Sequence, residues 1–249
     1  MRLQGKVAIV TGAGGGIGAA ICRRFAAEGA ALIGVDVDDA ALASMATSAR
    51  AAGARVETLL GDAAEEATAE AAVARARREF GGLHVLVSNA VCDVPLGALT
   101  GLTLADWRRT MAVNLDAAFL FCKHAIPAME AGGGGSIILI ASQLGRVARP
   151  GRPWYCAAKG ALIQLAKAMA LDHAGQNIRV NSLSPGPVET ARYLRNFDTL
   201  EAARASHHTL VGRLGTPDEI AAGAVYLAGE DSTFVTGADL LIDGGYTAV

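Results

Sequence analysis

The stretch Lys6-Val-Ala-Ile-Val-Thr-Gly-Ala-Gly-Gly-Gly-Ile-Gly18 joins a short apolar segment to a glycine-rich turn, and an amphipathic helix is predicted to follow it as far as Glu28. An apolar run of this length bounded by a turn is typical of a buried strand. Glycines let the backbone turn tightly and approach a ligand, and the unpaired amides that begin the next helix suit a pyrophosphate. The spacing departs from G-x-G-x-x-G because the glycines are Gly12, Gly16 and Gly18. The flanking strand and helix are what such a turn requires.

The same order of strand, polar residue and helix repeats along the chain. Further strands are predicted at 31–35, 55–60, 83–87, 136–141, 177–183 and 238–245. Alternating strands and helices form a parallel sheet with right-handed crossovers, and ligands bind at the carboxyl ends of its strands. The polar residues that follow the strands should therefore share one edge: Asp36, Asp62, Asn89, Ser142 and Ser184. We predict one doubly wound α/β domain over 1–249, with about seven parallel strands and helices on both faces.

Composition sets the class of protein. The chain has 249 residues, of which 52% are hydrophobic and 18% charged, so it can bury a full core and is not disordered. No apolar run approaches the roughly 20 residues that span a bilayer, and the predicted first strand leaves no room for a signal peptide. A formal net charge of −2 argues against nucleic acid as a partner. The four cysteines include no C-x-x-C pair, so we expect no metal, no disulfide and a soluble cytoplasmic protein.

Asp36 ends the second predicted strand, 18 residues after Gly18. A carboxylate at this place can accept hydrogen bonds from both ribose hydroxyls of an adenosine and repels a 2′-phosphate. Neither Ala13 nor Val37 supplies a cation that would bind such a phosphate. The sequence therefore predicts NAD rather than NADP. The alternative is that Asp36 only caps the helix predicted to begin near Asp38.

A second motif, Tyr155-x-x-x-Lys159, lies in an Ala-rich run of helical period over 155–174, so both side chains share one helix face. An ammonium about 4 Å from a phenolate stabilises it by on the order of 4 kcal/mol at an effective dielectric near 20. Such a phenol can exchange a proton near neutral pH, as general acid–base catalysis requires. Ser142 ends the strand before it and should direct its hydroxyl into the same region. Tyr and Lys four residues apart also occur by chance, so the pair indicates a catalytic site only in combination with other motifs of the chain.

The context resembles the short-chain dehydrogenase/reductase family, in its short single-domain branch. Four motifs occur in the family's order and the resemblance covers the whole chain: Thr11-Gly12-x-x-x-Gly16-Ile17-Gly18, Asn114, Ser142 and Tyr155-x-x-x-Lys159. The resemblance implies a Rossmann-type domain that reversibly transfers a hydride between NAD and a secondary alcohol or ketone. It implies that Tyr155 exchanges the hydroxyl proton and that Ser142 positions the substrate oxygen. Lys159 would hold the nicotinamide ribose, and Asn114 would kink its helix and hold a water in the proton path to Lys159.

The resemblance also implies the cofactor-binding residues. They are Thr11, Gly12, Gly14, Gly15, Gly16, Ile17, Gly18, Asp36, Asp62, Ala63, Asn89, Ala90, Tyr155, Lys159, Pro185, Gly186, Val188 and Thr190. Asp62 would contact the adenine, and Thr190 would hold the nicotinamide side. One departure is that the family's Asn-Asn-Ala-Gly is Ser88-Asn89-Ala90-Val91 in this chain, and the valine should narrow the loop beside the substrate.

The segment 187–212 is predicted to be irregular and, by the resemblance, to form a substrate lid. The substrate-binding residues implied are Ser142, Leu144, Arg152, Tyr155 and Tyr193. Other candidates for the lining are Cys92, Asp93, Val94, Gln143, Trp154, Pro187 and Phe197. This mixture of polar and aromatic side chains is consistent with a sugar, a polyol or a hydroxy acid. His207 and His208 are expected to face solvent rather than bind a metal.

Two other functions stay open. One is a 3-oxoacyl thioester (acyl-carrier-protein) reductase on the same scaffold, which Asp36 disfavours because those relatives mostly use NADPH. The other is a non-catalytic nucleotide-binding protein, which would not need Asn114, Ser142, Tyr155 and Lys159 together. Helices are predicted at 103–121 and 121–130. Because relatives pair the apolar helices corresponding to 112–128 and 157–170 across two-fold axes, we expect a homotetramer.

Overall fold

The computed structural model describes residues 1–93 and 96–248, and within these ranges the strands form one parallel sheet. The strands are β1 Val7–Thr11, β2 Ala31–Asp36, β3 Val56–Leu60, β4 Val85–Ser88, β5 Gly135–Ile140, β6 Ile178–Pro185 and β7 Asp239–Ile242. Their order is β3-β2-β1-β4-β5-β6-β7, so the direction of winding reverses between β1 and β4. Ligands of such sheets bind at that reversal. The predicted seven-stranded parallel α/β fold is confirmed.

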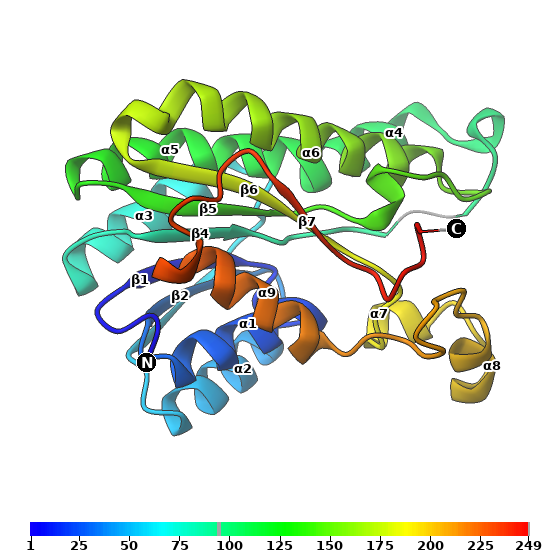
Figure 1. Ribbon diagram of the computed structural model, residues 1–249, viewed down its shortest axis with the longest axis horizontal. Coiled ribbons are helices and arrows are strands. Elements are labelled where there is room, and N and C mark those ends of the chain that lie inside the picture. The colour runs from blue at the N-terminus through cyan, green and yellow to red at the C-terminus, as the bar shows by residue number, and fades with distance from the viewer. Residues whose placement is uncertain (94–95, 249) are drawn as a thin grey trace.

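Helices cover both faces of the sheet (Figure 1). One layer contains α1 Gly16–Ala27, α2 Asp39–Ala51 and α9 Pro217–Ala228; the other contains α3 Glu66–Phe80, α5 Ala117–Ala131 and α6 Pro153–His173. Side chains of β1 alternate between the two layers, because successive strand residues point to opposite faces. Ala8 and Val10 pack with the first layer, and Val7 and Ile9 with the second. All four are nearly or fully buried, which explains why these strands are apolar throughout.

The helical region before β5 differs from the prediction. Helix α4 covers Leu104–Met111, a π-helical turn follows over Ala112–Asp116, and α5 continues to Ala131. The predicted boundary at Phe121 is wrong, because Phe121 is fully buried in the middle of the second core layer and α5 passes through it. The interruption lies seven residues earlier, around Asn114, where one turn of the helix is wider than the others.

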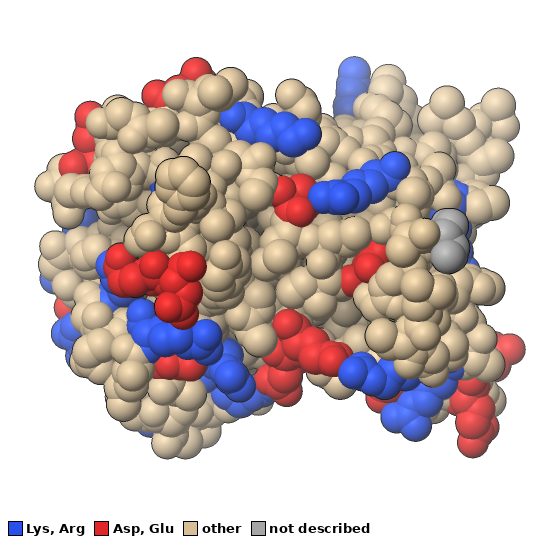
Figure 2. All heavy atoms as spheres, viewed as in Figure 1, with Lys and Arg blue, Asp and Glu red and all other residues tan. Residues whose placement is uncertain are grey.

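The segment 187–212 contains two short helices rather than only irregular chain. They are α7 Ala191–Leu194 and α8 Leu200–Ala205, and each begins with a threonine whose hydroxyl accepts a backbone amide, Thr190 and Thr199 respectively. Single 3-10 turns lie at Leu99–Gly101, Gln143–Gly145, Ala174–Gln176 and Glu230–Ser232. On the face shown in Figure 2, basic and acidic side chains are interspersed. Within the described ranges, no helix combines the length and apolarity that a membrane crossing demands.

Candidate active site

Two connected clefts lie at the carboxyl ends of the strands. The glycine cleft, as we call it, is lined among others by Gly12, Gly15, Gly16, Ile17, Asp36, Asp62, Ala63, Asn89, Ala90 and Thr190. The tyrosine cleft is lined among others by Ser142, Leu144, Tyr155, Lys159, Pro185, Gly186 and Val188. The two clefts are continuous because they share lining residues. The shared residues are Ile17, Asn89, Val91, Thr190 and Arg192. This arrangement suits an elongated ligand that passes from one cleft into the other.

The turn between β1 and α1 leaves room for such a ligand. Gly15 is the N-cap of α1 and has no side chain to cap the first amides of the helix. A Cβ built on Gly15 would find no atom within 4 Å, so the backbone borders open space. Gly12 and Gly16 have φ values of 62° and 43°, a conformation that other residues rarely adopt. Uncapped amides beside open space form a site for a pyrophosphate.

Three other residues of the predicted set shape this turn without lining the cleft. Thr11 is fully buried, and its hydroxyl accepts hydrogen bonds from the amides of Asn89 and Ala90. The amide of Gly14 donates to a carboxylate oxygen of Asp36 at 2.8 Å. A Cβ on Gly18 would overlap the carbonyl oxygen of Gly12, so only glycine fits there. The side-chain amide of Asn89, the residue after β4, donates to the carbonyl oxygens of Thr11 and Gly12. These hydrogen bonds attach the turn between β1 and α1 to the end of β4.

Asp36 stands in the glycine cleft at the end of β2. Besides the amide of Gly14, its carboxylate accepts hydrogen bonds from the amides of Val37 and Asp38. The alternative that Asp36 caps the next helix is wrong, because Asp38 is the N-cap of α2 and accepts the amide of Ala41. Backbone amides therefore hold the Asp36 carboxylate at the border of the cleft.

Asp62 also lines the glycine cleft, but both of its oxygens already have partners. One accepts the amide of Ala64, and the other accepts Nη1 of Arg109, each at 2.9 Å. Burial opposes the charged form, yet these two donors lower the pKa of Asp62. Arg109 and Arg195 line the same cleft and were missed from the sequence. The partner of Arg109 is 47 residues away along the chain, so no local pattern indicated the pair.

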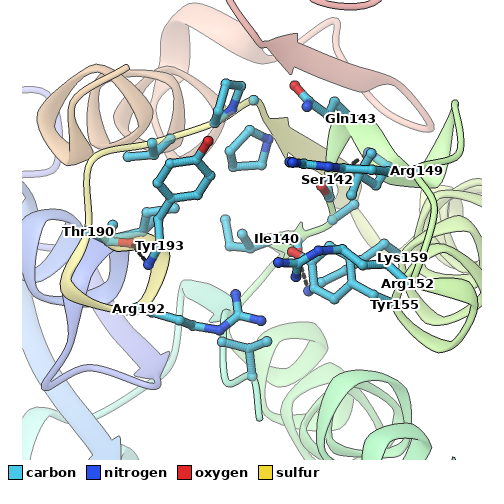
Figure 3. A pocket seen from close by; sticks show the side chains of 18 of the residues that line it. Ile140, Ser142, Gln143, Arg149, Arg152, Tyr155, Lys159, Thr190, Arg192 and Tyr193 are labelled. Carbon is cyan, nitrogen blue, oxygen red and sulfur yellow. Dashed lines mark hydrogen bonds between the residues drawn. The ribbon is translucent and has the colours of Figure 1, made fainter. Parts of the chain in front are cut away.

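Ser142, Tyr155 and Lys159 converge in the tyrosine cleft (Figure 3). Ser142 follows β5, is 7% exposed and accepts the amide of Leu144. Tyr155 is in the first turn of α6, which Pro153 begins, and Lys159 is one turn later. The edge of Trp154 packs against the ring of Tyr155, with ring centres 5.5 Å apart. The segment after β5 and the first turns of the next helix, α6, thus present a hydroxyl, a phenol and an amine to one space.

Lys159 differs from the expected ammonium. Its Nζ lies 5.7 Å from the centre of the Tyr155 ring and donates to the carbonyl oxygen of Ile140 at 2.6 Å. Burial, assisted by the charge of Arg192, lowers the pKa of Lys159 to about 7. Lys159 therefore changes its charge near neutral pH rather than near the ordinary value of 10.5. A second cationic side chain near Tyr155 is Arg192, whose Cζ is 5.5 Å from the centre of the ring.

Asn114 lies in the π-helical turn and is 2% exposed. Its amide nitrogen donates to the carbonyl oxygen of Thr110 at 3.0 Å and to the sulfur of Cys92 at 3.5 Å. Its oxygen is buried and has no hydrogen-bond partner among the described residues. Such orphaned acceptors are rare, and a water can satisfy them. Among the hydrogen bonds of the described residues, none joins Asn114 to Lys159, which bonds Ile140 instead.

Only some of the other predicted lining residues lie on the tyrosine cleft. Those that lie on the tyrosine cleft are Asp93, Gln143, Leu144, Arg152, Pro187 and Tyr193. Trp154 and Phe197 are not among its lining residues, since Trp154 is buried in the core and Phe197 packs against the ring of Tyr193. Cys92 lines the glycine cleft instead, and Val94 lies outside the described residues. The residues that sequence reasoning missed include Arg149, Arg192, Asn196, Ser206 and Tyr246.

The segment 187–212 contributes several of these groups. The hydroxyl of Tyr193 in α7 lies 2.9 Å from Oγ of Ser206 just after α8, which ties the two short helices together. Arg192 bonds Asp93, from the segment after β4, through Nε at 2.6 Å. His208 is exposed, whereas His207 is partly buried and lies near the hydroxyl of Thr209. Among the described residues, no three His, Cys, Asp or Glu side chains are grouped to hold a metal ion.

Comparison with known proteins identifies the class. A family model described as Enoyl-(Acyl carrier protein) reductase matches residues 12–247. D-threitol dehydrogenase of Mycolicibacterium smegmatis is 37% identical over 246 residues, which cover 99% of this chain and 94% of that protein. Cis-4-hydroxycyclohexanecarboxylate dehydrogenase of Sinomonas cyclohexanicum is 39% identical over 244 residues, covering 98% and 97%.

A solved structure described as a short-chain dehydrogenase/reductase from Burkholderia xenovorans superposes with a TM-score of 0.92 at 38% identity, covering 100% of this chain and 98% of that one. The protein is a nicotinamide-dependent oxidoreductase of the CH–OH class. It belongs to the short-chain dehydrogenase/reductase family.

Proposed function

We propose that this protein transfers a hydride reversibly between NAD and a secondary alcohol or its ketone. The observation that carries the proposal is the position of Ser142, Tyr155 and Lys159 in one cleft that opens directly into the glycine cleft. A ligand that fills the glycine cleft therefore has a path to the reacting groups. The dehydrogenases similar to this chain act on threitol, a hydroxycyclohexanecarboxylate and cyclohexanol, as their names state.

The residues present fit a nicotinamide dinucleotide. The open space beside Gly15 and the uncapped start of α1 would receive the pyrophosphate. Asp36 would accept the hydroxyls of the adenosine ribose, which a 2′-phosphate would prevent. Ala63 and Ala90 would line the adenine half, and Asn89 would stand at the junction of the clefts. The nicotinamide half would lie against Pro185, Gly186, Val188, Thr190, Tyr155 and Lys159.

In the oxidation direction, the carbon–hydrogen bond of the alcohol breaks and a carbonyl bond forms. NAD, when bound, supplies a nicotinamide ring that accepts the hydride. The oxygen of Tyr155 takes the hydroxyl proton, and the hydroxyl of Ser142 holds the substrate oxygen in place. Lys159, with a pKa of about 7, can take up and release a proton, and its hydrogen bond to the Ile140 carbonyl oxygen holds the amine in place. The free oxygen of Asn114 offers a place for a water on that path.

Three further properties belong to the proposal. The segment 187–212 acts as a lid over the substrate, which would exclude water during the reaction. The protein assembles as a homotetramer through α5 and α6, whose exposed apolar residues include Phe119 and Leu171. It works in the cytoplasm, a reducing compartment that suits four free cysteines.

One rival needs a direct comparison, because the description of the matching family model, Enoyl-(Acyl carrier protein) reductase, names a reductase of acyl thioesters, although not of 3-oxoacyl ones. A 3-oxoacyl thioester reductase of this family would mostly use NADPH, and the carboxylate of Asp36 disfavours that cofactor. Purified protein should therefore be tested with NAD against polyols, sugars and hydroxy acids, and with NADPH against a 3-oxoacyl thioester. We expect reduction of NAD by at least one secondary alcohol. Turnover of the thioester alone would favour the rival, and NAD binding without any turnover would indicate a non-catalytic protein.

A further inference from the structure

The tyrosine cleft contains more cationic than anionic side chains. Arg149, Arg152 and Arg192 line it, and Asp93 is the one carboxylate among its described lining residues. Figure 3 shows Arg149 and Arg152 reaching in from one side, beside Tyr155, and Arg192 from the opposite side. The first two arginines come from the segment between β5 and α6, and the third from α7. Three guanidinium groups from two separate segments thus border the space above the reacting phenol.

The single carboxylate is already engaged. Asp93 accepts Nε of Arg192 at 2.6 Å and Nη2 of Arg195 at 3.5 Å. Burial opposes the charge of Arg192, yet Tyr155 and Asp93 raise its pKa. Arg192 is therefore a fixed cation that holds Asp93. Among the described lining residues of this cleft, no other carboxylate is present to pair with Arg149 or Arg152.

Arg152 has only a weak neutral partner. Its one hydrogen bond within the described chain goes to the amide oxygen of Asn196, at 3.4 Å. Burial, together with the charges of Arg149 and Arg192, lowers the pKa of Arg152. By contrast, Arg213 and Arg146 outside the cleft each meet a carboxylate at 2.6 Å, and some red and blue side chains adjoin in Figure 2. A half-buried cation without a counterion is unfavourable unless a ligand supplies one.

Resting on the proposed function, we propose that the substrate is a hydroxy acid whose carboxylate binds Arg152, with Arg149 as a second contact. Its hydroxyl group then faces Tyr155 and Ser142. The planar guanidinium group suits a carboxylate because two parallel hydrogen bonds can form. A neutral polyol or sugar would leave the charge of Arg152 unpaired. Arg192 stays bound to Asp93 and closes the opposite side of the cleft.

The test compares each hydroxy acid with its neutral amide, which has nearly the same shape. Suitable pairs are 4-hydroxycyclohexanecarboxylate with 4-hydroxycyclohexanecarboxamide, and 3-hydroxybutanoate with 3-hydroxybutanamide. We expect kcat/KM for the better acid to exceed that for its amide by at least about tenfold, the size of one charge-assisted hydrogen bond. Arg152→Gln should remove that preference, mainly through a higher KM for the acid, and should leave the amide within about twofold. Arg152→Lys should restore part of the preference because it restores the charge.

Two further variants test whether the preference for the acid depends on these arginines in particular. Arg149→Gln changes an exposed residue and should reduce the preference by a smaller factor of about two to five. Arg78→Gln removes the same charge near the end of α3, where its partner is the adjacent Glu79, and should change nothing. Equal use of acid and amide, or an equal loss of both in Arg152→Gln, would overturn the proposal. A clear preference for polyols would overturn it as well.

A binding measurement separates this proposal from the proposed function. Cyclohexanecarboxylate has no hydroxyl group and cannot react, but it should raise the melting temperature of the NAD-bound protein more than cyclohexanecarboxamide does. That difference should vanish in Arg152→Gln. If no alcohol is oxidised while this difference is present, the proposed function fails and the carboxylate site stands. If alcohols are oxidised while the difference is absent, the carboxylate site fails and the proposed function stands.

Discussion

The amine of Lys159 lies 2.6 Å from the carbonyl oxygen of Ile140, the last residue of β5. This hydrogen bond anchors α6 to the strand that carries Ser142, so the same contact that aligns the two segments also buries the amine. Burial lowers the pKa of Lys159 to about 7, with Arg192 as a second cause. Lys159 is therefore a group that changes its charge near neutral pH, which an exposed lysine does not do.

The first prediction concerns stability and pH. Between about 7, the pKa of folded Lys159, and the ordinary value of 10.5, the unfolded chain binds a proton that the folded chain does not. The contribution of Lys159 to the stability therefore rises with pH in this window. We expect the free energy of unfolding of the wild type, minus that of Lys159→Met, to rise from pH 7 to 9 by up to about 1.4 kcal/mol per unit. Urea titrations without cofactor measure it, and a difference that does not change with pH would contradict it.

The second prediction separates chemistry from cofactor binding. Tyr155→Phe keeps the ring and its contact with Trp154, so NAD should bind within about twofold of the wild type while the rate of oxidation falls by about 10²–10⁴. Lys159→Met should slow the reaction and also weaken NAD, because the side chain has two proposed roles. Fluorescence titration and steady-state rates measure both. If Tyr155→Phe keeps more than roughly one per cent of the rate, the proton leaves by another route.

The third prediction concerns the choice of cofactor. The carboxylate of Asp36 should make kcat/KM with NAD at least about tenfold higher than with NADP, a difference of about 1.4 kcal/mol. Asp36→Ala should shrink that ratio, whereas Asp39→Ala removes an equal charge from the first turn of α2 and should not. A preference for NADP in the wild type would overturn the prediction. Arg109 and Arg195, which line the same cleft, would then be the first candidates to test as partners of the 2′-phosphate.

The fourth prediction concerns assembly. Phe119 on α5 is 55% exposed and Leu171 on α6 is 83% exposed, although both are large and apolar. Burial of these residues between subunits would remove that surface from water. We expect light scattering to give four times the chain mass of 25.4 kDa, and Leu171→Glu to lower it. A wild-type monomer at micromolar concentration would refute the tetramer.

Local signals account for what the sequence predicted well. The strand, glycine turn and helix around Gly12 lie within one short stretch. The alternation of strands and helices was enough to predict the parallel sheet. Each of these features depends on residues only a few positions apart.

The features of the site that the sequence did not predict depend on contacts between residues that are far apart in the chain. Arg192 reaches Asp93 from 99 residues away, so no pattern in either segment indicates the pair. Adjacent helix residues point about 100° apart, and with Tyr155 facing the cleft the neighbouring Trp154 is turned into the core. The charge of Lys159 likewise depends on burial that only the assembled sheet creates.

The widened turn at Ala112–Asp116 gives Asn114 a second task. In a regular helix, the backbone amide of Asn114 would bond the carbonyl oxygen of Thr110, four residues earlier. Here the side-chain amide of Asn114 donates to that oxygen. The nitrogen of this carboxamide thus bonds the helix backbone, while its oxygen is left free for the water proposed above. A substitution that removes the carboxamide, such as Asn114→Ala, disturbs both, so lost activity in that variant cannot by itself be ascribed to the proton path.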